Sequence, residues 1–188
     1  MIIDHSREKL LNAIVYFLQN TKYCGKTKLF KLLYYLDFLH FKETGKSITG
    51  LDYFAWNYGP VPKDLYDEIS KKPKPDLTQT IVIPPRNKSN NAFTEIKAKI
   101  KFDNTYFTKR ELRILEQVAF IFKDAMADSM VDSSHLPNHP WDITIKSKGL
   151  QQKIDYFLAL DNSENSLSTE EVHDRIADRK EVEKIFSE

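Results

Sequence analysis

The chain is poor in the residues that covalent cross-links and metal cages require, because it has one cysteine, Cys24, among 188 residues. A single cysteine excludes a disulfide within the chain and a zinc site built from several cysteines. An excess of charge is also absent, since 28 Lys and Arg residues stand against 27 Asp and Glu residues and leave a formal net charge of +1. This balance disfavours nucleic-acid binding, which usually requires a strongly basic surface.

Long apolar runs are missing as well. No segment approaches the roughly 18 uncharged apolar residues that span a bilayer, and the first ten residues carry charges where a signal peptide needs an apolar run. Hydrophobic residues nevertheless make up 41% of the chain, which is enough to bury a core. We therefore expect a cytoplasmic protein with no membrane partner.

Helical periodicity dominates the first part of the chain. Apolar residues recur at helical spacing over residues 7–19. A second helix is expected from Thr27, as its capping residue, to about Glu43, with Gly45 just past its end. This second segment is apolar nearly all round, which predicts a central helix covered by neighbours on several sides.

Proline punctuates the following segments. Residues 56–62 are expected to form a rigid turn, because both of its prolines fix φ and lack an N–H. A short helix is expected over residues 63–70. The Lys-Lys-Pro-Lys-Pro-Asp sequence of residues 71–76 predicts a loop that no helix crosses.

The period then changes from helix to strand. Residues 81–83 are β-branched, and over residues 96–102 apolar side chains alternate with lysines. These two segments are expected to pair as a hairpin across a polar loop at residues 86–91. Helical patterns return after Thr108 and Ser168, each of which opens a capping box, and a further helical stretch is expected after Gly149.

These patterns predict a mainly α fold, a compact helical domain with a small antiparallel β-hairpin inserted in the middle. Residues 1–161 are expected to form the domain. Residues 162–188 are expected to be a linker followed by a C-terminal amphipathic helix.

Candidates for catalysis or metal binding are sparse. Asp37, His40 and Glu43 share one helix face, which would suit an acid–base or metal cluster. We favour instead a buried aspartate and histidine bonded to loop backbone, because no further ligand stands out. Prolines near His135 and His139 prevent the helical histidine pair that binds zinc. The sequence therefore predicts no catalytic residue, no metal and no cofactor.

Two groups of residues are candidates for contacting a partner. Lys97, Lys99 and Lys101 line one face of the expected strand; they would suit a nucleic acid, but we favour lysines that keep an edge strand from pairing with other chains. Trp56 and Tyr58 stand beside the rigid turn. They are either core residues or, if exposed, the amphipathic anchors that interfaces use.

Three blocks of sequence carry a resemblance to a known family: residues 27–50 with K-L-x-K-L-L-Y-Y, residues 53–69 with A-W-x-Y-G-P-V-P, and residues 133–141 with His, Pro and Trp. In this order and spacing, residues 7–160 resemble the Panacea domain, also described as the SocA-like or GepA-like domain. The motif residues are Lys31, Tyr34, Tyr35, Trp56, Tyr58, Gly59, Pro60, Val61, His135, Pro140 and Trp141, and Asp37 and His40 fall within the same blocks.

The resemblance implies an antitoxin of bacteria or phages that neutralises a cognate toxin, encoded by the adjacent gene, through direct contact. It leaves open an adaptor that delivers the toxin to a housekeeping protease and, less favoured, a nucleic-acid-binding regulator. The motif residues are expected to be scaffold, and toxin specificity is expected in residues 73–107 and 162–188. The residues expected to bind the toxin are Trp56, Tyr58, Lys97, Lys99, Lys101 and Phe107.

Overall fold

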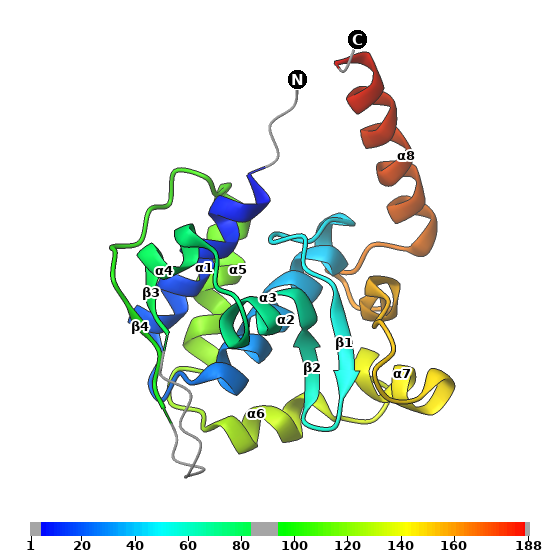
Figure 1. The fold of residues 1–188 in the computed structure, drawn as a ribbon. Coiled ribbons are helices and arrows are strands. Elements are labelled where there is room, and N and C mark those ends of the chain that lie inside the picture. Colours follow the sequence, from blue (N-terminus) through cyan, green and yellow to red (C-terminus); the bar gives the residue numbers. More distant parts are fainter. Residues whose placement is uncertain (1–4, 84–93, 187–188) are drawn as a thin grey trace.

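The computed structural model describes residues 5–83 and 94–186. Within these residues the chain forms eight α-helices, one 3₁₀ helix and two separate two-stranded antiparallel sheets (Figure 1). The expected fold class, mainly α with a small hairpin, is confirmed. None of the described helices is long and apolar enough to cross a membrane.

Helix α2 (Lys26–Thr44) is the centre of the fold, as its apolar sequence predicts. It contacts α1 (Ser6–Asn20), α5 (Lys109–Ile121) and several other elements. Gly45 ends α2 with φ at 68°, a left-handed conformation that glycine adopts without steric cost. The prediction that Thr27 caps the helix is wrong: Gly25 is the capping residue and no side chain caps the first turn.

The first sheet is a hairpin where a rigid turn was expected. Strand β1 (Tyr53–Trp56) pairs with β2 (Gly59–Pro62), with Trp56 opposite Gly59 at the turn. Both prolines lie in β2, which has a partner on one side only and so can lack their N–H groups. Helix α3 (Lys63–Ser70) follows as predicted.

The predicted loop at residues 71–76 is partly wrong, because helix α4 (Pro75–Thr80) begins inside it. Pro75 stands at the start of α4, where a missing N–H costs nothing. The second sheet pairs β3 (Ile81–Val82) with β4 (Lys97–Ala98), so the predicted pairing is confirmed over two residues per strand. The loop expected at residues 86–91 lies outside the described residues.

The second half of the chain continues with α6 (Ala127–Ser134) and α7 (Pro140–Lys148) after α5. The helix expected after Gly149 is wrong. Residues 151–154 instead bond to β1, with the Ala55 N–H donating to the Gln152 carbonyl oxygen at 2.9 Å, and only a short 3₁₀ helix, η1 (Tyr156–Ala159), follows. Because the backbone N–H and C=O groups of this segment bond to β1, they cannot also form the hydrogen bonds of a helix.

The last helix, α8 (Thr169–Ile185), extends away from the body (Figure 1). Its capping box at Ser168 and the box at Thr108 of α5 are both confirmed. Val172 is its one buried residue among those described, and Arg179 donates to the Gly45 carbonyl oxygen at 2.6 Å. The contacts of α8 with the domain given by these residues therefore end at Arg179.

Candidate protein-binding site

The three motif blocks meet around the buried amine of Lys31. Its side chain is 1% exposed, and Nζ donates to the Pro60 carbonyl oxygen of β2 at 3.0 Å. Gly59 has φ at 94°, and a Cβ there would lie 2.6 Å from Lys31 Nζ and 2.5 Å from Ser134 Oγ. A side chain at position 59 would therefore have to displace the Lys31 amine and the Ser134 hydroxyl, in addition to adopting a positive φ.

The electrostatic environment of Lys31 is unusual. Burial lowers the pKa of its ammonium from the ordinary value of 10.5 to about 7. No described carboxylate forms an ion pair with it. Lys28, one turn earlier and also buried, differs: its Nζ donates to three carbonyl oxygens, those of Lys22, Lys123 and Ala125.

A hydrogen bond from the Trp141 indole joins the third motif block to the hairpin turn. Trp141 Nε1 donates to the Trp56 carbonyl oxygen at 3.0 Å. His135 stacks on Trp141, with ring centroids 3.7 Å apart and planes 13° from parallel. Burial and the neighbouring Lys31 lower the pKa of His135. Pro140 starts α7 and so sets the position of Trp141.

The tyrosines of the first block pack into the body. Tyr34 is buried and meets Tyr53 of β1 edge-on, with centroids 5.7 Å apart. Tyr35 stacks on Phe122 at 4.8 Å. Together with buried Val61 these contacts join α2 to the hairpin and to the end of α5. The geometry thus gives these motif residues a packing role.

Asp37 holds the loop before β1 in place. It is fully buried and accepts hydrogen bonds from the N–H groups of Ile48 and Thr49, both at 2.8 Å, and from the hydroxyls of Thr49 and Tyr53. Burial raises the pKa of Asp37 to about 6, although these hydrogen bonds act in the opposite direction. His40 Nδ1 lies 2.6 Å from the Lys46 carbonyl oxygen.

Asp37 and His40 are therefore bonded to loop backbone, as we favoured from the sequence, and neither lines the pockets described below. Glu43 accepts a hydrogen bond from Arg113, so Asp37, His40 and Glu43 each have a different partner and do not form a cluster. Among the described residues no group of three or more His, Cys, Asp or Glu side chains is placed to hold a metal.

An apolar pocket of about 470 Å³ lies beside the hairpin turn. Lys26, Thr27, Phe30 and Lys31 of α2 form one wall. The opposite walls come from three places: the turn with Trp56, Asn57, Tyr58 and Val61, then Tyr66 of α3, then Leu150 and Gln151. The pocket is thus built by segments from four parts of the sequence.

The two aromatic residues singled out from the sequence both line this pocket. Trp56 is half-buried and meets Tyr66 edge-on at 4.8 Å. Tyr58 is 75% exposed at the turn. A fixed indole beside an exposed tyrosine, next to an apolar hollow, is the composition of interface hot spots. Sequence reasoning missed the rest of the pocket wall, because its residues are far apart in the chain.

The remaining candidates for toxin binding lie elsewhere. Lys97, Lys99 and Lys101 are exposed, but β4 is well separated from the β1–β2 hairpin (Figure 1). Lys99 Nζ donates to the Thr78 carbonyl oxygen at 2.6 Å. Phe107 is half-buried with its ring centroid 5.8 Å from that of Phe102. The structure does not bring these residues together with Trp56 and Tyr58.

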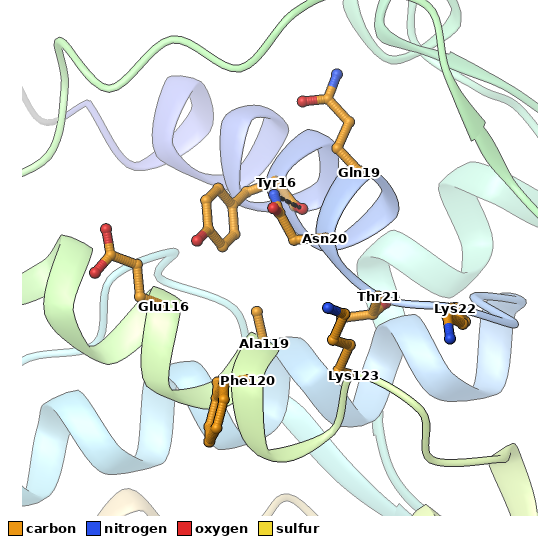
Figure 2. Close-up of a pocket in the computed structure, with 9 residues that line it drawn as sticks. All are labelled: Tyr16, Gln19, Asn20, Thr21, Lys22, Glu116, Ala119, Phe120 and Lys123. Carbon is orange, nitrogen blue, oxygen red and sulfur yellow. Dashed lines mark hydrogen bonds between the residues drawn. The ribbon is translucent and has the colours of Figure 1, made fainter.

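A second hollow, of about 510 Å³, lies between α1 and α5 (Figure 2). Tyr16 and Asn20 reach into it from α1, and Glu116 and Lys123 flank it on the α5 side. Phe120 borders it and is 83% exposed. This surface had no sequence signal beyond an apolar residue on an outer helix face, and it is more polar than the pocket at the hairpin.

A helical scaffold with a rigid hairpin, an exposed tyrosine and an apolar pocket has the features of a protein-binding domain. Comparison with known families agrees. Residues 29–142 match the family described as antitoxin SocA-like, Panacea domain, and the chain belongs to this family. The family supports an antitoxin role and suggests a non-enzymatic one. Comparisons with curated proteins and with solved structures found no significant match.

Proposed function

We propose that this protein neutralises a cognate toxin in the cytoplasm by binding it directly, with the hairpin turn and its pocket as the contact surface. The observation that carries the proposal is Tyr58, 75% exposed on a turn that Trp141 and Lys31 hold from behind. The backbone of a fixed turn loses little conformational entropy when it binds, so less of the contact energy of its aromatic side chains is offset. The partner is expected to be the protein encoded by the adjacent gene.

Co-expression with that neighbour tests the proposal, by growth rescue and by isolation of a stoichiometric complex. Tyr58→Ala should weaken the complex about 30-fold or more, because a central interface tyrosine contributes roughly 2 kcal/mol. Phe120→Ala is the matched control, since it removes a similarly exposed aromatic residue from the other hollow. Equal affinity of Tyr58→Ala and wild type, or loss only with Phe120→Ala, would reject the hairpin surface.

A second candidate function is delivery of the toxin to a housekeeping protease. It is favoured by one observation: Val182, Ile185 and Phe186 at the end of α8 are 42%, 64% and 59% exposed. An adaptor needs a second surface in addition to the one that holds the toxin, and we propose residues 162–188 for that purpose, with residues 1–161 as the toxin-binding domain. Rescue of growth that requires the protease as well as the tail would support it.

A further inference from the structure

The pocket beside the hairpin carries charge of one sign. Four aromatic residues line it, Phe30, Trp56, Tyr58 and Tyr66, and the lysines Lys26 and Lys31 are its only ionisable cationic lining residues among those described. No Asp or Glu of the described residues lines it. An occupant that is purely apolar would fill the hollow but would leave uncompensated the charge of Lys26, and that of Lys31 while its amine is protonated.

Lys31 is the stronger of the two reasons to expect an anionic occupant. A lysine ammonium has three donors. Lys28, on the same helix, places all three on carbonyl oxygens, whereas Pro60 is the one described acceptor for Lys31. The protonated form of a buried amine with one hydrogen bond and no ion-pair partner is stabilised by a negative group brought close to it.

The start of α2 adds to this field. The helix has no side-chain cap and no acidic residue in its first turn. The unpaired N–H groups of a helix N-terminus carry partial positive charge. Lys26 and Thr27, which belong to this turn, line the same pocket as Lys31. Lys26, the first turn of α2 and the protonated form of Lys31 are therefore three positive sources beside one apolar hollow.

We infer that the pocket receives an apolar side chain directly adjacent to an aspartate or glutamate in a segment of the toxin. The apolar group fills the space between the rings, and the carboxylate lies on the side of the pocket formed by α2. This inference rests on the proposed function and specifies what the toxin presents. In addition to any packing role, Lys26 and Lys31 would then contact the carboxylate of the toxin.

The chemistry of the pocket can be tested without the toxin, using phenylacetate as the probe and phenylacetamide, its neutral analogue of the same shape, as the comparison. Two-dimensional NMR of the whole protein, followed at the Trp56 indole and the Tyr58 and Gly59 amides, reports the site. Phenylacetate should bind with a roughly millimolar dissociation constant, about three- to ten-fold more tightly than phenylacetamide. Equal affinity for the two probes, or shifts elsewhere in the protein, would overturn the inference.

Two substitutions sharpen this measurement. Lys31→Met keeps the aliphatic stem and should abolish the preference for the carboxylate. Because Lys31 is buried, Lys26→Gln provides a second variant that leaves the core intact, and it should reduce the preference about two- to five-fold. Lys97→Gln, an exposed lysine on β4, is the control and should change nothing.

Binding measurements with the toxin distinguish failure of the acidic anchor from failure of direct neutralisation. Lys26→Glu should weaken the complex with the neighbour-encoded toxin by about ten-fold or more, because it places like charges together. A reversed charge on one acidic residue of the toxin should then restore affinity. If wild type binds the toxin and Lys26→Glu binds it equally well, the acidic anchor is wrong and direct neutralisation stands. If wild type forms no complex, direct neutralisation itself fails, and the inferred occupant fails with it.

Discussion

Helices α2 and α8 have similar lengths, 19 and 17 residues, but opposite relations to the rest of the molecule. Twelve residues of α2 are buried, whereas in α8 only Val172 is. The conformation of α2 is therefore fixed by tertiary packing, and that of α8 by its capping box and a few contacts at one end. We therefore expect the hairpin pocket, which α2 supports, to be rigid, and the C-terminal tail to be held less firmly.

The largest effect is expected at Gly59, where the hairpin touches α2. Gly59→Ala should destabilise the protein by about 3–5 kcal/mol, because a Cβ would overlap Lys31 and Ser134 in addition to the strain of a positive φ. Gly149→Ala is the matched control: φ is 89° there, but a Cβ would meet nothing within 4 Å. It should cost about 1–3 kcal/mol, the backbone strain alone.

Urea denaturation of both variants measures the difference directly. Similar losses in the two proteins would mean that the hairpin can move away from α2 at little cost. The β1–β2 hairpin would then not be held rigidly against α2, and Tyr58 would not stand on a fixed turn.

A smaller effect is expected from the titration of Lys31. Its pKa is about 7 in the folded protein and 10.5 ordinarily, so between these values the unfolded chain binds more protons than the folded one. Stability therefore rises with pH over this range. The contribution of Lys31 between pH 7 and pH 9 is about 2 kcal/mol.

The measurement compares wild type with Lys31→Met in denaturant at several pH values, because other groups titrate in both proteins and cancel in the difference. The stability of wild type should increase relative to the variant as the pH is raised. A difference that does not depend on pH would show that the Lys31 ammonium is well solvated in the folded state.

The same contrast explains what the sequence could predict. The helix α2 follows the local rule of periodicity, and α5 and the start of α8 also follow the rule of capping; these predictions are confirmed, apart from the capping residue of α2. The β1–β2 hairpin and the segment after Gly149 depend on each other, because residues 151–154 bond to β1. Neither carries a local signal that reveals the pairing, so both were predicted as something else.

The candidate site divides in the same way. Trp56 and Tyr58 could be singled out because aromatic residues beside a Gly-Pro turn are visible in the sequence. Tyr66 and Leu150 could not, since only the fold brings them to the same pocket. The burial of Lys31 was likewise hidden: a lysine on a helix is normally solvated, and its environment is set by Gly59 and Pro60 from the next block.

The smallest effect is expected in helix α8. Arg179 donates to the Gly45 carbonyl oxygen, and this hydrogen bond joins the middle of α8 to the end of α2. Arg179→Ala should cost about 1 kcal/mol or less in global stability. It should speed amide hydrogen exchange in the second half of α8 several-fold, because none of the described residues of that half is buried. Arg175→Ala, an exposed arginine on the same helix, is the control and should leave exchange unchanged. If both variants exchange like wild type, the Arg179 hydrogen bond does not hold the second half of α8, and the tail is then joined to the domain mainly near the start of α8, where Leu167 N–H donates to the Lys42 carbonyl oxygen and Val172 is buried.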